Sequence, residues 1–197
     1  ANSFYGRNSV DEILWDVCRN CISRLGFEDA VVYLLDEKRN VLVQKAAYGP
    51  KNPKDFEISH PLEIPVGKGI VGTVAQTGKP EIISDTLRDP RYIADDDCRM
   101  SELSVPIVYE GKVIGVIDSE HSQRNFFTRE HLRLLSTIAS ICSTKIAKAQ
   151  LDQEASDRER LLLEVGKKVA ETRLMALRAQ MNPHFIFNSL NSIQECV

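Results

Sequence analysis

Apolar residues at two different spacings divide the start of the chain into a helix followed by strands. A capping-box pattern from Ser9 to Glu12 predicts the helix N-terminus, because a serine and a glutamate three residues apart can each satisfy the other's backbone N–H. Gly26 fits the helix C-cap. One apolar stripe at helical spacing lies between them, formed by Ile13, Leu14, Val17, Cys21 and Leu25. Two apolar runs, 30–35 and 41–48, flank a polar turn and predict a β-hairpin.

The middle of the chain predicts short elements separated by glycine, proline and polar residues. Short strands are expected at 62–65 and 81–84, with a small helix over 70–76 between them. The segment 85–100 is polar and rich in turn-forming residues. We therefore expect it to cross the domain as an irregular connection.

A second, longer hairpin and a helix follow. Strands are predicted over 102–109 and 112–120, joined at Glu110-Gly111. Strict alternation along the second strand sorts its side chains onto two faces, with Val113, Gly115 and Ile117 on one and Ile114, Val116 and Asp118 on the other. Thr128 caps a helix, whose predicted apolar stripe is Leu132, Leu135, Ile138, Ile141 and Ile146. This order of elements predicts an α+β fold, an antiparallel sheet flanked by helices.

A long helix is predicted from Thr128 to Met181, because only Gly166 disfavours it, at a tolerable cost of about 1 kcal/mol. Charges of both signs are distributed along this helix. Its apolar side chains can therefore be buried only against another surface. Small and apolar side chains recur every seven residues, at Ala155, Leu162, Val169 and Ala176, with Val165, Thr172 and Ala179 between them. The pattern predicts a soft, dimeric coiled coil over 149–181. A charged surface helix is the alternative.

Asn182-Pro183 breaks this helix and starts another. Proline costs little at the first helical position, and asparagine is a good N-cap, so His184 falls in the first turn. Two faces then recur at the same intervals, an apolar one at Ile186, Leu190, Ile193 and Val197, and a polar one at His184, Asn188, Asn191 and Glu195. An imidazole on the polar face offers a neutral, nucleophilic nitrogen at cell pH and can carry a phosphoryl group.

The run NPHFIFNSLN at 182–191 closely resembles the phosphoacceptor box of the LytS-type sensor histidine kinases. The resemblance implies that His184 accepts the γ-phosphoryl group of ATP and passes it to an aspartate on a response regulator. It also implies that Asn188 helps to orient the phosphoryl group or an attacking water. Other histidine kinases carry an acid just after the histidine. Phe185 occupies that position here, so the box leaves the general base open.

Residues 8–148 resemble a GAF domain. The resemblance rests on four stretches, IPVGKGIVG at 64–72, SD at 84–85 with DPRY at 89–92, SELSVPI at 101–107, and GKVIGV at 111–116. It implies the antiparallel-sheet fold predicted above and a role in sensing a small molecule or a partner. It does not identify the ligand.

Features specific to one GAF ligand or reaction are weak. Cys98 is followed by Arg99, where a covalent bilin site would usually have a histidine. Cys98 also lies in the segment that carries a catalytic cysteine in free-methionine-sulfoxide reductases, but Val71 stands where a partner cysteine is expected. A polar cluster at a strand end is interpreted as a solvated rim rather than a metal site, and consists of Asp118, Glu120 and His121.

Composition narrows the class of protein. The hydrophobic content of 43% suits a normal globular core, and a net charge of −3 gives no electrostatic case for nucleic acid. Five scattered cysteines, an odd number, suit a reducing cytoplasm. No run approaches the roughly 20 apolar residues that span a bilayer. Because the chain begins at Ala1, we expect it to be part of a longer protein, in which upstream membrane segments are possible.

These observations predict a GAF sensor over 1–148, a signalling coiled-coil helix over 149–181, and the start of a histidine kinase phosphoacceptor domain at 182–197. The full-length protein is expected to be a protein-histidine kinase that uses ATP with Mg²⁺ and dimerises through its C-terminal helices. An ATP-binding domain, in cis or in trans, and a response regulator are the expected partners. The chain itself should bind no cofactor or metal and should be inactive alone. Two rivals remain, a non-enzymatic GAF binding and dimerisation module and a thiol-dependent GAF reductase acting through Cys98.

Overall fold

The computed structural model describes residues 10–54, 57–94 and 98–180. Contacts divide the chain into one compact unit that ends at Leu151 and a second that begins at Asp152. The elements are α1 (Val10–Asp16), η1 (Val17–Cys21), η2 (Ile22–Leu25), β1 (Ala30–Asp36), β2 (Val41–Tyr48), β3 (Glu63–Pro65), α2 (Gly69–Thr77), β4 (Glu81–Ile83), η3 (Thr86–Arg88), β5 (Ser101–Tyr109), β6 (Lys112–His121) and α3 (Arg129–Gln180).

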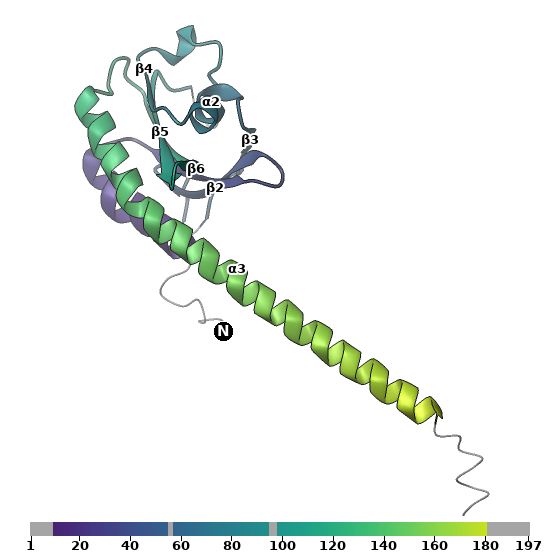
Figure 1. Ribbon diagram of the computed structural model, residues 1–197. Helices are drawn as coiled ribbons and strands as arrows, with labels where there is room; N and C mark the ends of the chain where they lie inside the picture. Colours follow the sequence, from purple (N-terminus) through teal and green to yellow (C-terminus); the bar gives the residue numbers. More distant parts are fainter. Residues whose placement is uncertain (1–9, 55–56, 95–97, 181–197) are drawn as a thin grey trace, which may run out of the picture. The chain divides into compact units, whose positions relative to one another are not determined.

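The strands of the first unit form one sheet in the order β3-β2-β1-β6-β5-β4, and each neighbouring pair is antiparallel (Figure 1). The sheet and its flanking helices confirm the predicted α+β fold. The β5–β6 turn has φ of +48° at Glu110 and +79° at Gly111. Positive φ at both positions is what a two-residue hairpin turn of the favoured twist requires, so this turn fixes the pairing of the two longest strands.

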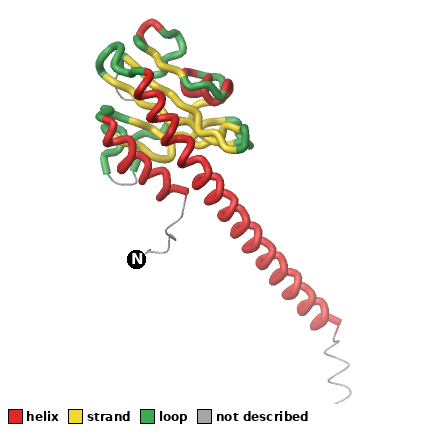
Figure 2. The backbone as a smooth tube through the Cα atoms, turned by 60° about the vertical axis from the view of Figure 1, so that its left-hand side comes forward, coloured by secondary structure: helices red, strands yellow, loops and turns green. Residues whose placement is uncertain are grey.

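Each face of the sheet carries its own apolar core. On one face, α1 and the first part of α3 pack side by side, and Leu14, Ile117 and Leu135 are among the buried residues (Figures 1 and 2). On the other face, the short helix α2 packs through Val74 against Leu42 and Val116. The sheet is therefore buried on both sides near its centre, which explains why β5 is buried at most of its positions rather than at alternate ones.

The predicted N-terminal helix is correct in its extent but wrong in its regularity. Its first turns are α-helical, but Val17–Cys21 form a wider π-helical turn and Ile22–Leu25 a tighter 3₁₀ turn. The wide turn shifts the later side chains around the axis, so Cys18 and Ile22 are buried whereas Leu25 is only half-buried. Gly26 ends the helix with φ of +74°, as its predicted C-cap role requires.

The predicted two faces of β6 are wrong at one end because the strand contains a bulge. Ile107 pairs with Gly115 but Val108 pairs with Val113, which leaves Ile114 without a directly opposite residue. The extra residue reverses the alternation. Val113 therefore packs with Val116 on the α2 side, and Ile114 packs on the same side as Ile117. Asp118 keeps the predicted face because it lies beyond the bulge.

The predicted apolar stripe of α3 is correct except at Ile141, whose side chain is 63% exposed. The buried face repeats at helical spacing and consists of Leu135, Ala139, Cys142 and Ile146. Ile141 directly precedes Cys142 of the buried face. Successive residues of an α-helix are about 100° apart around its axis, so the Ile141 side chain points toward solvent.

The second unit is described from Asp152 to Gln180 as the continuation of α3, and its residues up to Arg178 are all exposed in the single chain. They include large apolar side chains, at Leu161, Leu162, Leu163, Val165, Val169, Leu174, Met175 and Leu177. Such side chains favour burial against another surface. The coiled coil and the dimer remain predictions. Within the described residues, no helix combines the length and apolarity needed to cross a bilayer.

Candidate ligand cavity with buried carboxyl groups

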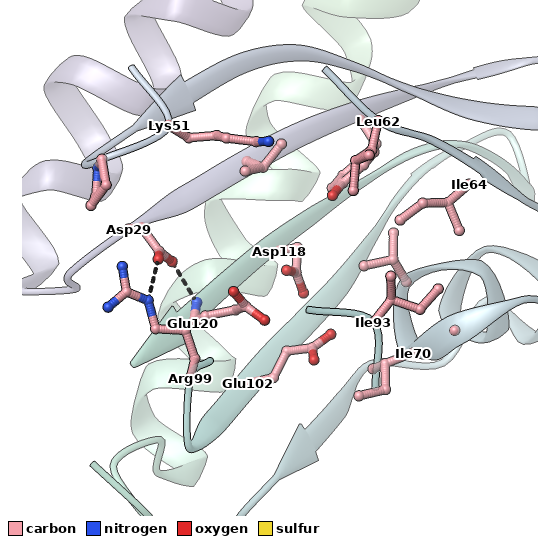
Figure 3. Close-up of a pocket in the computed structure, with 15 residues that line it drawn as sticks. Asp29, Lys51, Leu62, Ile64, Ile70, Ile93, Arg99, Glu102, Asp118 and Glu120 are labelled. Atoms are coloured by element: carbon pink, nitrogen blue, oxygen red, sulfur yellow. Dashed lines mark hydrogen bonds and ion pairs between the residues drawn. The ribbon is translucent and has the colours of Figure 1, made fainter. Parts of the chain in front are cut away.

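A cavity of about 40 Å³ lies between the sheet and α2 in the first unit (Figure 3). Its polar side is formed by side chains from β5, β6 and the segments that precede β1 and β5. Its apolar side includes Ile64 of β3, Ile70 of α2 and Ile93. Among the described residues that line it, four carry carboxyl groups and two carry cationic groups, namely Asp29, Glu102, Asp118 and Glu120, and Lys51 and Arg99.

Strand geometry brings three of these carboxyl groups together. Asp118 and Glu120 are two residues apart on β6, so their side chains share one face of the sheet. Glu102 of β5 is directly opposite Glu120, and Ser104 is directly opposite Asp118. Directly opposed residues place their Cβ atoms about 5 Å apart. The three carboxyl groups therefore converge from two adjacent strands, and Figure 3 shows them close together on the cavity wall.

Asp29 ties the start of β1 to the cavity. Its carboxylate accepts a hydrogen bond from the Glu120 backbone N–H at 2.8 Å and one from Arg99 Nε at 3.1 Å. Burial raises the pKa of Asp29 to about 6, although the hydrogen bond from Glu120 and the charge of Arg99 oppose that rise. Asp29 is thus ionised at pH 7. Its carboxylate holds the Arg99 side chain at the side of the cavity where Asp29 lies.

The carboxyl groups of Glu102 and Glu120 carry protons more readily than ordinary glutamates. Burial is the main cause for both, because removing a carboxylate from water disfavours its charged form. The neighbouring Asp118 charge raises both pKa values further. The pKa of Glu120 rises to about 9, and that of Glu102 rises well above its usual range.

One hydroxyl group lies between Glu102 and Asp118. Ser104 Oγ is closely hydrogen-bonded to Asp118 Oδ1 and lies 3.4 Å from Glu102 Oε1, which is long for a hydrogen bond between oxygens. A serine hydroxyl has a single proton. Because the hydroxyl donates this proton in its hydrogen bond to Asp118, Ser104 does not stabilise a charge on Glu102 to a comparable extent.

The interpretation of Asp118, Glu120 and His121 as a solvated rim is wrong. Asp118 and His121 are each only 6% exposed. Asp118 and Glu120 line the cavity, whereas His121 lies on the opposite face and stacks on Phe126, with ring centroids 3.5 Å apart. The alternation of the strand and the opposed acid Glu102 were visible in the sequence. Their burial was not, because it depends on α2 and the loops that cover this end of the sheet.

Comparison with known proteins identifies the first unit. The profile of the GAF domain family matches residues 7–147, which is most of the chain. The chain belongs to the GAF domain family. A GAF domain from an Acinetobacter phosphoenolpyruvate-protein phosphotransferase has the same fold, with a TM-score of 0.64 at 24% identity over 73% of this chain and 85% of that one.

A second family profile, that of histidine kinases, matches residues 172–197. The sensor protein LytS of Bacillus anthracis is 25% identical over 126 residues, which cover 64% of this chain and 19% of that protein. The free methionine-R-sulfoxide reductase of Saccharomyces cerevisiae is 35% identical over 79 residues, covering 40% of this chain and 44% of that protein. The chain spans about half or less of the curated relatives that it matches.

The other predicted site residues are distributed as follows. His184 and Asn188 lie outside the described residues. Cys98 is exposed, whereas Cys18 and Cys142 are buried in the GAF core. Val71, at the position where a reductase would be expected to have a partner cysteine, lines the cavity. Within the described residues, no group of three or more histidine, cysteine or acidic side chains is arranged to hold a metal ion.

The protonated carboxyl groups predict that the GAF domain loses stability as the pH rises from 7 to 9. The folded pKa of Glu120, about 9, lies above the unfolded value of about 4.5. A group whose pKa is higher in the folded than in the unfolded state stabilises the fold fully at pH values below its unfolded pKa. This stabilisation is lost as the pH rises through the folded pKa. We expect a loss of about 2 kcal/mol over this interval, measured as the free energy of urea unfolding.

Glu120→Gln is the control for this prediction, because the amide keeps the shape of the acid but cannot ionise. Its unfolding free energy should vary much less between pH 7 and pH 9. His121, whose pKa is lowered by burial, is already neutral over this interval and does not interfere. Equal pH dependence in the two proteins would show that Glu120 ionises normally in the folded state.

Proposed function

We propose that this chain is the sensory and phosphoacceptor part of a two-component histidine kinase. The GAF cavity binds a signal, and binding controls the transfer of the γ-phosphoryl group of ATP to His184. One observation supports the proposal most directly. The same chain contains a GAF domain with an internal cavity and a segment, including His184, that matches the histidine kinase family. Asn188 orients the phosphoryl group or the water that attacks it. The phosphoryl group then passes to an aspartate of a response regulator.

The route for the signal begins where α3 packs on the sheet. Strands β5 and β6 present Glu102 and Asp118 to the cavity on one face. On their other face, Leu103 and Ile117 share a core with Leu135 of α3. Close-packed cores do not absorb a strand displacement locally. A ligand that favours one arrangement of β5 and β6 therefore favours one packing of α3, and the populations of the kinase states shift with it.

The remaining parts of the kinase lie beyond the described residues. An ATP-binding domain, in cis or in trans, supplies ATP with Mg²⁺, and the C-terminal helices pair in a homodimer. The exposed apolar side chains of α3 beyond Asp152 support this pairing. The scattered cysteines support a cytoplasmic location for this part of the protein.

Phosphate incorporation by the full-length protein tests the sensory half of this proposal. Glu102→Gln changes the cavity wall without altering His184, so the autophosphorylation rate is expected to change about fivefold or more, within the usual range of coupling between sites. Glu110→Gln is the matched control, because this glutamate is exposed in the β5–β6 turn.

An unchanged rate in Glu102→Gln, with the GAF domain still folded by circular dichroism, would separate the cavity from kinase control. The first unit would then be a binding or dimerisation module that does not regulate His184.

A further inference from the structure

Residues 122–128 connect β6 to α3, and the His121 ring at the end of β6 holds the start of this β6–α3 connection. The Gln123 backbone N–H donates to His121 Nδ1 at 3.0 Å. A ring nitrogen accepts a hydrogen bond only when it carries no proton, so this bond assigns the ring proton to Nε2. Nε2 lies 3.5 Å from a carboxylate oxygen of Glu28. The folded connection therefore depends on a neutral His121.

Packing keeps the His121 ring in this orientation. The ring is buried and stacks face to face on Phe126 of the connection, with centroids 3.5 Å apart and planes 3° apart. It cannot turn Nδ1 toward water without displacing Phe126. A proton on Nδ1 would therefore face the Gln123 N–H and remove its hydrogen bond. The aromatic face of Phe126 attracts a cation, but that attraction does not restore the lost bond.

Three ionisable groups from other elements act on the ring, namely Glu28 from the loop before β1, Arg99 from the segment before β5 and His131 from α3. Burial lowers the pKa of His121, because the charged ring would lose water. Glu28 opposes this effect, whereas the positive charges of Arg99 and of a protonated His131 lower the pKa further. The Glu28 carboxylate also accepts hydrogen bonds from Ser122 Oγ at 2.6 Å and from its N–H at 2.8 Å, so it is shared with the connection itself.

The far end of the connection contains a second histidine in a similar role. The His131 backbone N–H donates to Thr128 Oγ1 at 3.2 Å, and the Thr128 N–H points back to His131 Nδ1 at 3.4 Å. This reciprocal arrangement is a capping box, with histidine where glutamate or glutamine is usual. The second contact is long and therefore weak. A protonated His131 would lose it and would place a positive charge in the first turn of α3, where the helix dipole disfavours cations.

We propose that the β6–α3 connection is an acid-sensitive switch, in which protonation of His121, reinforced by that of His131, releases residues 122–128 and the first turn of α3 from the end of the sheet. The rest of the helix in the GAF domain stays packed, because its buried face begins at Leu135. The claim that this release alters phosphorylation of His184 rests on the proposed function, whereas the opening itself does not.

The direction of the pH dependence follows from the closed and open states of the connection. Release exposes His121, which then has its ordinary pKa of about 6.5, whereas burial lowers the pKa of His121 in the closed state. The closed state is therefore favoured fully above about pH 6.5, and this advantage is lost as the pH falls toward the lowered pKa. We expect the equilibrium constant for opening to increase at least about threefold from pH 7 to pH 5, below the limit of about tenfold per pH unit for one proton.

Amide hydrogen exchange on the 197-residue chain tests the proposal, with protection factors that correct for the intrinsic effect of pH on exchange. The reporters are the N–H of Asn125, which donates to the Ser84 carbonyl at 2.9 Å, and the N–H of Leu132, which donates to the Thr128 carbonyl at 3.0 Å. Their protection should fall at least about threefold from pH 7 to pH 5. Protection at the centre of β5 and β6 should not fall, because protonated Glu120 stabilises the folded domain in this interval.

The double variant His121→Asn, His131→Gln should lose this pH dependence. An asparagine oxygen can accept a hydrogen bond from the N–H two residues on, as His121 Nδ1 does, but it does not titrate. Glutamine is a usual capping-box residue at the position of His131. His60→Asn, in an exposed loop, is the matched control and should keep the pH dependence. If the double variant does not fold, the single variant His131→Gln leaves the stacked ring in place and should keep a reduced pH dependence.

NMR titration of the His121 ring is the direct measurement, and we expect a proton on Nε2 at pH 7 and a midpoint below pH 6.5. The proposal is overturned if that midpoint is 6.5 or higher, or if protection of Asn125 and Leu132 is equal at pH 7 and pH 5. It is also overturned if the double variant loses protection as the unaltered chain does, or if His131→Gln alone removes the whole effect.

Kinase assays on the full-length protein separate this switch from the proposed function. A phosphorylation rate with the same pH profile in the double variant and in the unaltered protein would refute control of His184 through the connection. The acid-sensitive opening itself would stand, because hydrogen exchange measures it without the kinase reaction.

Discussion

Replacing His184 with glutamine in the full-length protein is expected to abolish phosphate incorporation from ATP. The amide nitrogen of glutamine is not nucleophilic, so the side chain cannot accept a phosphoryl group although it has a similar size and polarity. Labelling with radioactive ATP and Mg²⁺ should fall at least about 100-fold, as expected when a nucleophile is removed. The label on the unaltered protein should be lost in acid and retained in base, which identifies phosphohistidine.

The matched control is His60→Asn, which replaces an exposed loop histidine of the GAF domain. His60 has φ of +43°, a conformation that asparagine adopts readily, so this variant should fold and be labelled normally. Acid-labile labelling that persists in His184→Gln would mean that another histidine is the acceptor. The resemblance at 182–191 would then describe a structural helix.

Replacing Gly115 with alanine is expected to destabilise the GAF domain by about 3 kcal/mol, at the upper end of the usual cost of overpacking. A Cβ atom at this position would lie 2.3 Å from the Tyr33 carbonyl oxygen. That oxygen belongs to the backbone of β1, which pairs directly with β6 here, so it cannot move without separating the two central strands. The melting temperature should fall by more than about 6 °C for a domain of this size.

Gly166→Ala is the control for this prediction. Apart from the adjacent helix backbone, no described atom lies within 4 Å of a Cβ built at Gly166, and the residue is inside α3. Alanine should favour the helix by up to about 1 kcal/mol and leave the GAF melting transition unchanged. If Gly115→Ala melts within about 1 °C of the unaltered protein, β1 and β6 must separate more easily than their pairing indicates.

The carboxyl cluster shows how far sequence reasoning could reach. The β5–β6 hairpin was predictable from two apolar runs and Glu110-Gly111, and its register places Glu102 opposite Glu120. Neither run indicates that α2 and the loop before β3 cover this end of the sheet. The same acids would be an ordinary solvated rim on an uncovered sheet. Their burial, and with it the altered protonation, comes largely from α2 and the loop before β3, which lie in a different part of the chain.

The bulge at Ile114 and the wide turn at Val17–Cys21 illustrate a second limit. In both places an irregular turn or an extra residue changes which side chains share a face on its two sides. Local spacing alone gives no sign of the shift, because a regular strand and a bulged strand use the same residue types. The surrounding core selects between them, since only one choice buries Ile117 or Ile22.

The sequence by itself determined the GAF fold, the long helix and the resemblance to a histidine kinase at 182–191, because each depends on residues close together in the chain or on a recurring spacing. The tertiary structure alone decided which acids are buried, which carboxyl groups lie together in the cavity, and which face of α3 contacts the core. Those properties depend on the distance between groups from different elements and on the exclusion of water between them, and neither is encoded in local spacing.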